Sequence, residues 1–271
     1  MAAGGQHTAY PYSIYNIMSF LSFLQSKNYR PSTIQSYLSA ISFGHKIRGF
    51  QDPQDSFLLN KFMIGIKRMS TASDQLQPIT VQRLTELIGL VATLRTTNYI
   101  KTLLKAVFSL LYHGCLRISE LAKSGRADHA LRHHQAKYQF SFPRGKPTSV
   151  TLHLNSFKHS KEPVKIKIMS SSDPMICPVQ LLDNFQNIRP HSTYLFCEQN
   201  GNPISRSFVV RWLNKLVAKS SFANLKINTH SLRIGRTTDL ALAGASDAYI
   251  RQAGRWSSNA YLKYIRSVVV L

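Results

Sequence analysis

Apolar residues recur at helical spacing through the first part of the chain. Residues 10–69 contain three stretches in which apolar positions fall three or four residues apart, at 14–24, 32–49 and 57–67. This spacing places the apolar side chains on one face of a helix, and Ser32 is suited to cap the second stretch. The pattern predicts a small all-helical unit at the N-terminus.

The stretch at 68–80 interrupts the apolar pattern. It reads RMSTASDQLQPIT, which is polar and includes Pro78 near its end, as is typical of a linker. We therefore expect two domains, an N-terminal one at 1–75 and a larger one at 76–271.

In the larger domain, the spacing of apolar residues changes along the sequence. Residues 81–91 and 99–112 look helical, whereas 138–142, 149–154 and 164–168 alternate between apolar and polar positions. Alternation is typical of strands with one solvated face. Helical spacing resumes at 178–188, 205–217, 231–243 and 248–252. The sequence predicts a mainly α fold with a small antiparallel β-sheet, so the larger domain is α+β.

Charge is the unusual feature of the composition. The 271 residues include 34 Lys and Arg against 12 Asp and Glu, a net charge of +22, which points to a polyanionic partner. No apolar run approaches the roughly 20 residues that cross a bilayer, and no signal peptide is recognisable. We therefore expect a nucleic-acid partner and no membrane. Cys115, Cys177 and Cys197 form no CxxC pair, which argues against a disulfide framework or a zinc finger.

Four short segments concentrate polar residues within apolar sequence, at 112–121, 156–161, 229–235 and 254–266. Each has an ordinary structural explanation by itself. Arg117 can pair with Glu120, a turn lysine such as Lys158 is usually solvated, and Tyr264 can be a half-buried aromatic. Within 229–235, His230 and Arg233 are three residues apart and share a helix face. The order and spacing of the four segments together favour a functional interpretation.

The combination resembles the tyrosine recombinase (phage integrase) family. LRISEL around Arg117 resembles the family's first-arginine box, HSLR at 230–233 its His-x-x-Arg box, and GRW…Y its nucleophile segment. The strings FKHS (157–160), CPV (177–179), HSLRIG (230–235) and GRWSSNAYLKYIR (254–266) are similar to those of a eukaryotic mobile-element branch, the Crypton, Ngaro and DIRS-like elements. The segment 32–49 resembles the family's helical core-binding (SAM-like) domain, which would precede an α+β catalytic domain.

The resemblance implies a DNA strand transesterification and assigns roles to six residues, with Glu120 as a supporting seventh. Arg117 and Arg233 would bind the scissile phosphate, for which ionised, planar guanidiniums are suited. His230 would occupy the family's base-like position, and Trp256 would position and pack where many members have histidine. Glu120 would orient groups of the site. The remaining two roles fall to Lys158 as general acid and Tyr264 as nucleophile.

Some assignments stay open. Lys161 lies in the same turn as Lys158 and is the alternative acid, and Tyr261 is the alternative nucleophile. Arg236 and Asp239 stand where the branch more often has small residues, and the sequence offers no mechanism for them. The apolar tail at 268–271 is compatible with packing in cis or in trans.

The predicted function is site-specific recombination through a 3′-phosphotyrosyl intermediate, for integration or excision of a mobile element. We expect double-stranded DNA as partner, a homotetramer on two DNA sites, no cofactor and no metal. A eukaryotic origin would place the protein in the nucleus, and any other origin in the cytoplasm. The alternatives are a catalytically silent DNA-binding protein derived from a recombinase, and a type IB topoisomerase.

Overall fold

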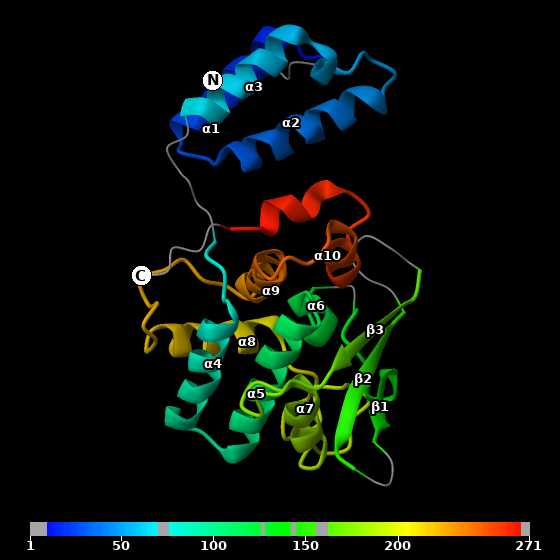
Figure 1. The fold of residues 1–271 in the computed structure, drawn as a ribbon. Coiled ribbons are helices and arrows are strands. Elements are labelled where there is room, and N and C mark those ends of the chain that lie inside the picture. Colours follow the sequence, from blue (N-terminus) through cyan, green and yellow to red (C-terminus); the bar gives the residue numbers. More distant parts are fainter. Residues whose placement is uncertain (1–9, 70–75, 126–127, 142–144, 156–161, 267–271) are drawn as a thin grey trace, which may run out of the picture. The chain divides into compact units, whose positions relative to one another are not determined.

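The computed structural model describes residues 10–69, 76–125, 128–141, 145–155 and 162–266 (Figure 1). The chain divides into two compact units, Met1–Asp74 and Gln75–Leu271. The tail at 268–271, whose docking the sequence left open, lies outside the described residues. Within the described part, no helix has the length and apolar character needed to cross a membrane.

The first unit is helical, as the apolar spacing predicts. It comprises α1 (Ile14–Ser26), α2 (Pro31–Lys46), the 3₁₀ turn η1 (Pro53–Asp55) and α3 (Phe57–Met69). Its core joins apolar residues of the three helices, among them Leu21, Leu38 and Leu59. The expected cap at Ser32 is wrong. The N-cap of α2 is Arg30, because Pro31 has its φ already fixed near the helical value and so suits the first helical position.

The second unit surrounds a long buried helix with shorter helices and a small sheet. Its elements are α4 (Val81–Leu90), η2 (Val91–Thr93), α5 (Asn98–His113), α6 (Ile118–Leu121), η3 (His133–Gln135), β1 (Ala136–Phe140), β2 (Pro147–Leu154), β3 (Val164–Met169), α7 (Pro178–Gln186), α8 (Arg206–Val217), α9 (His230–Leu242), α10 (Asp247–Gly254) and η4 (Asn259–Tyr264). The short α6 and the 3₁₀ elements have too few residues to leave a periodic signal in the sequence.

The three strands form an antiparallel sheet in the order β1-β2-β3. Tyr138 pairs with Val150, and Val150 pairs with Ile168. Along β3 the lysines at 165 and 167 are exposed while Ile168 is buried, so the predicted basic, solvated face is confirmed. The mainly α fold with a small antiparallel sheet is confirmed as well.

The core of the second unit is centred on α5. Residues 106–112 of this helix are all buried, and α5 packs against α4, α7 and α9, while α7 also packs against β2. A helical stretch that is buried on all sides has to be surrounded by other elements. Because α5 runs directly into the segment with Arg117, this core fixes the position of the first candidate site residue.

Helix α9 packs unusually closely against the segment that precedes α4. The Ile79 N–H donates to the Ser231 carbonyl at 2.9 Å, and the backbone of Ile79 passes directly over Gly235. A Cβ built on Gly235 would lie 1.7 Å from the Ile79 oxygen. Only glycine, which has no side chain, permits this approach.

Asp239 joins three helices, which gives a role to a residue that the sequence left unexplained. Its carboxylate accepts a 2.7 Å hydrogen bond from the N–H of Val81, the first residue of α4, and a second one from the Tyr112 hydroxyl at the end of α5. Burial raises the pKa of Asp239 and that of Tyr112. Arg236 lies over the Tyr112 ring, 5.7 Å from its centroid. These contacts hold α9 against α4 and α5.

The close approach at Gly235 yields a stability prediction. Gly235→Ala should lower the free energy of unfolding by about 3 kcal/mol or more, because overpacking against side chains already costs about 1–3 kcal/mol and backbone yields less. Gly89→Ala is the matched control, since a Cβ at this exposed α4 position meets nothing within 4 Å. It should raise stability by up to about 1 kcal/mol. Urea unfolding measures both, and equal effects would contradict the packing described.

Candidate active site

The first candidate residue lies at a sharp turn after α5. Gly114 ends the helix, Cys115 takes a left-handed φ of 48°, and Arg117 is the N-cap of α6. The Glu120 carboxylate reaches back to accept the Arg117 N–H at 3.0 Å and lies 3.4 Å from its guanidinium, as the third residue of a capping box does. The Arg117 side chain remains 18% exposed whereas Glu120 is 1% exposed.

Helix α9 supplies the second pair. His230 and Arg233 lie on the same face, as their spacing predicts, and both approach the ring of Tyr264. Arg233 is fully buried. Its guanidinium donates to the Cys115 carbonyl at 2.5 Å and to the Gly254 carbonyl. Among the described residues, its Nε has no hydrogen-bond partner.

The last segment completes the cluster. Tyr264 lies at the end of η4, with its ring centroid 5.1 Å from that of His230 and 4.8 Å from that of Trp256. The Arg233 guanidinium lies 4.4 Å from the Trp256 centroid and 5.8 Å from the Tyr264 centroid. Thr238 of α9 donates to the Tyr264 carbonyl at 3.2 Å and so holds the segment around Tyr264 against α9.

Tyr261 and Tyr264 have different surroundings although they are three residues apart. Tyr261 is 1% exposed and packs with Leu240 and Ile250. Its burial and a hydrogen bond with Asp247 raise the pKa of Tyr261. Tyr264 is partly exposed beside the histidine and the arginines. The geometry therefore favours Tyr264 over Tyr261 as the residue that meets a substrate.

The charges in this cluster affect His230 most. Burial, followed by the positive charges of Arg233, Arg117 and Arg266, lowers the pKa of His230 to about 4. Burial also lowers the pKa of Arg233, although an arginine stays charged at any working pH. At neutral pH the site therefore combines cationic guanidiniums with a neutral imidazole, an arrangement that attracts an anion and can accept a proton.

A third arginine, which the sequence interpretation did not single out, is part of the same network. The Arg255 side chain is only 5% exposed and donates to the Glu120 carboxylate at 2.8 Å. It also donates to the carbonyl oxygens of Gly114 and Cys115 at 3.3 Å each. The available signal was a charged residue between Gly254 and Trp256, but nothing in the sequence showed that it is buried.

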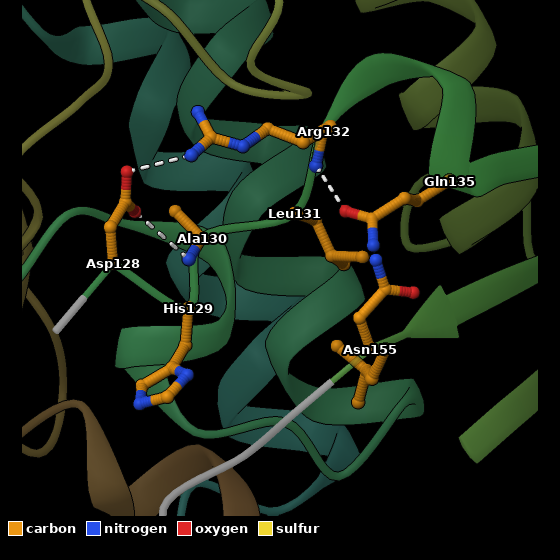
Figure 2. A pocket seen from close by; sticks show the side chains of 8 residues that line it. Asp128, His129, Ala130, Leu131, Arg132, Gln135 and Asn155 are labelled. Atoms are coloured by element: carbon orange, nitrogen blue, oxygen red, sulfur yellow. Dashed lines mark hydrogen bonds and ion pairs between the residues drawn. The ribbon is translucent and has the colours of Figure 1, made fainter. Parts of the chain in front are cut away.

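The predicted general acid lies outside the described residues. Lys158 and its alternative Lys161 belong to 156–161, the stretch that joins β2 to β3. Figure 2 shows a polar hollow whose lining residues include Asn155 at the end of this strand pair.

The polar groups around this hollow form hydrogen bonds with one another. Asp128 accepts hydrogen bonds from Arg132 and from the Tyr194 hydroxyl, each at 2.8 Å. The Gln135 side chain accepts the Arg132 N–H at 2.6 Å (Figure 2). These contacts fix the entry into β1, so the hollow supports the sheet rather than adding to the cluster around Tyr264.

The geometry brings His230, Arg233 and Trp256 together around the half-exposed Tyr264, and the charge of Arg117 acts on His230 and Arg233. A sequence comparison then decides the family, because the model of the phage integrase family matches residues 79–267. The chain belongs to the phage integrase family. The match covers the turn with Arg117, helix α9 and the Tyr264 segment.

Individual relatives agree with this membership in the phage integrase family. The recombinase Cre of Escherichia phage P1 is 21% identical over 93% of this chain and 76% of its own length. A Tn1549 transposon integrase in complex with circular intermediate DNA has a TM-score of 0.65 at 15% identity, covering 95% of this chain and 82% of its own. XerH recombinase bound to difH substrate has a TM-score of 0.62 at 12% identity, with 93% and 67% covered. These structural likenesses show the fold.

The lowered pKa of His230 yields a pH prediction for the free protein. An unfolded histidine takes up its proton near pH 6.5, whereas folded His230 does so only near pH 4. Stability therefore rises with pH between these values and falls as pH drops from 6.5 towards 4. His230→Gln should flatten part of this slope in urea unfolding. Burial also lowers the pKa of His113 to about 4, so His113 should account for the slope that remains in His230→Gln. An unchanged slope in His230→Gln would contradict the lowered pKa of His230.

Proposed function

We propose that the protein is a site-specific DNA recombinase that cuts and rejoins DNA through a 3′-phosphotyrosyl intermediate. The observation that carries this proposal is the position of Tyr264, partly exposed against His230 and Trp256 and next to a buried arginine. Membership in the phage integrase family supports the same chemistry. Relatives named as recombinases, integrases and DNA complexes support DNA as the substrate.

In the proposed first step, the Tyr264 hydroxyl oxygen attacks the phosphorus of a DNA phosphodiester. The new P–O bond to tyrosine forms while the bond to the 5′ oxygen breaks, so one ester replaces another. Arg117 and Arg233 stabilise the negative charge that gathers on the non-bridging oxygens. Burial is the main cause of the lowered pKa of His230 and the nearby positive charges are the second. An approaching phosphate offsets these charges, which makes the imidazole a better acceptor for the tyrosine proton.

The leaving 5′ oxygen needs a proton, because an alkoxide is a poor leaving group at neutral pH. We assign this proton to Lys158, in the stretch between β2 and β3, on the basis of the FKHS string. The return step reverses the chemistry. A 5′-hydroxyl from a second DNA strand attacks the phosphotyrosyl ester and releases Tyr264, and no external energy source is required.

The assembly follows from the reaction. Exchange of strands between two duplexes needs four cuts, and each chain offers one Tyr264, so we propose a homotetramer on two DNA sites. The net charge of +22 neutralises the DNA backbone, and the affinity should fall steeply with salt through counterion release.

The assignment to a branch of the family rests on short sequence strings. FKHS, CPV, HSLRIG and GRWSSNAYLKYIR support a place in the eukaryotic mobile-element branch. On this basis we propose that the protein integrates or excises a mobile element and acts in the nucleus. A transposon integrase among the structural relatives is compatible with a mobile element.

The nucleophile can be tested by covalent capture. The wild-type protein is incubated with a pool of duplex DNA whose centre is randomised, and DNA that stays attached in denaturing detergent is recovered and sequenced. Tyr264→Phe should abolish the adduct, because phenylalanine has no oxygen to form the ester. Tyr261→Phe is the matched control and should still form it, although loss of the buried hydroxyl can reduce the yield.

The outcomes of covalent capture separate the possible functions. An adduct that persists in Tyr264→Phe and disappears in Tyr261→Phe would move the nucleophile to Tyr261. DNA binding without any adduct from the wild type would favour a silent DNA-binding protein. Relaxation of supercoiled DNA by a monomer, without a sequence requirement, would indicate a topoisomerase.

The general acid can be tested with a modified substrate. Lys158→Ala should slow adduct formation by about 10²- to 10⁴-fold, the usual contribution of a general acid. Replacing the bridging 5′ oxygen by sulfur should restore the rate, because a thiol with a pKa near 8.5 leaves without protonation. Lys161→Ala is the control and should remain near the wild-type rate on both substrates. If only Lys161→Ala is rescued by sulfur, Lys161 is the acid.

A further inference from the structure

Arg255 is placed where a charged side chain is unusual. It follows α10 in the left-handed conformation, with φ 57° and ψ 47°, a position that glycine normally occupies at a helix C-terminus. Its guanidinium is nevertheless buried against the turn that precedes Arg117. A strained backbone and a buried charge at one residue indicate that the side chain has a specific role.

The two arginines bind opposite oxygens of Glu120 with different strength. The Arg255 guanidinium lies 2.8 Å from Oε2, whereas the Arg117 guanidinium lies 3.4 Å from Oε1. The shorter, charge-assisted hydrogen bond is the stronger one. Of the two guanidiniums, that of Arg255 therefore makes the closer pair with the Glu120 carboxylate, and the Arg255 side chain is 5% exposed.

This difference between the two pairs matters for phosphate binding. A carboxylate that pairs closely with Arg117 would compete with the phosphate for the same guanidinium. Arg255 also shares the Cys115 carbonyl with Arg233, so it connects both proposed phosphate-binding arginines to the segment that leads to Trp256 and Tyr264. Its position fits a residue that acts on the site without touching the substrate.

We infer that Arg255 is a positioning residue that neutralises Glu120 and thereby limits the competition of this carboxylate with the DNA phosphate for Arg117. The inference rests on the proposed recombinase function. It assigns Arg255 a task that lysine cannot fully perform, because an ammonium cannot reach the carboxylate and two carbonyl oxygens with the geometry of a planar guanidinium.

The test compares rate with affinity on one DNA duplex, the sequence recovered by covalent capture. Arg255→Gly fits the left-handed backbone without strain and removes the guanidinium. Adduct formation in a single turnover should slow by about 10²-fold, as when one preorganised charge is lost from a site. The Kd for the same duplex should change by less than about threefold, because the flanking backbone contacts dominate affinity.

A second substitution distinguishes electrostatics from a general structural role. If Arg255 acts by neutralising Glu120, removing the carboxylate charge should compensate for its loss. Arg255→Gly with Glu120→Gln should recover at least about tenfold of the rate lost in Arg255→Gly, within the contribution expected for one such charge. Arg255→Gly with Glu198→Gln is the matched control and should recover nothing, because Glu198 lies in a distant turn where it pairs with the backbone of Asn202 and Gly201. The rate of adduct formation by Arg255→Lys should lie between those of the wild type and Arg255→Gly.

Folding is monitored in the same variants. If Arg255→Gly alone does not fold, Glu120→Gln is compared with and without Arg255→Gly, and the inference expects rates within about threefold of each other once the carboxylate is neutral. A wild-type rate in folded Arg255→Gly would overturn the inference, as would a further loss of rate when Glu120→Gln is added.

The failure of this inference and that of the recombinase proposal can be told apart. Urea unfolding of the wild type, the two single variants and the double variant measures the coupling between Arg255 and Glu120 without DNA. Coupling in a wild type that never forms an adduct contradicts the recombinase proposal. A wild-type adduct with no coupling, and with an unaffected rate in Arg255→Gly, contradicts the inference alone.

Discussion

The carboxylate of Glu120 lies between the guanidiniums of Arg117 and Arg255, and the candidate site depends on how it is shared. Burying charge costs several kcal/mol per ion unless partners are close and well oriented. Hydrogen bonds from the arginines to backbone carbonyl oxygens, together with Glu120, offset this cost. The turn after α5 directs the carbonyl oxygens of Gly114 and Cys115 at Arg255 and Arg233. A concentration of positive charge is thereby held in place before any phosphate arrives.

Close backbone packing fixes α9, the helix that carries His230 and Arg233. Helix α9 is held on one side by Ile79 passing over Gly235, and at Asp239 by hydrogen bonds from α4 and α5. Its other side presents His230 and Arg233 to Tyr264. Side chains that must meet a substrate within fractions of an ångström need such a rigid support. One side of α9 therefore makes the packing contacts, and the other side carries residues of the candidate site.

Much of this arrangement could be predicted from the sequence, and the exceptions have physical reasons. Apolar periodicity predicted the helical first unit and the basic face of β3, because each residue's burial there follows from its place along one element. The spacing of His230 and Arg233 predicted a shared face for the same reason. The burial of Arg255 and the difference between Tyr261 and Tyr264 depend on contacts between different elements, which no local pattern records.

Local rules also failed where a neighbouring residue overrode them. Ser32 has the chemistry of a helix cap, yet Pro31 moved the start of α2 by fixing its own backbone angle. Asp239 had no interpretation in the sequence because its partners, Val81 and Tyr112, come from two other helices. The assignment of Lys158 stays a prediction from the FKHS string.

The connection between the two units has a practical consequence for engineering. The chain after the boundary is already part of the second unit, since Gln77 donates to the carbonyl of Lys226 and Ile79 to that of Ser231. The two acceptors, Lys226 and Ser231, lie on either side of His230, where α9 begins. A chimera that grafts a foreign N-terminal unit onto this enzyme should therefore keep Gln77 and everything after it. A junction placed later would remove an edge of the scaffold that holds the chemistry.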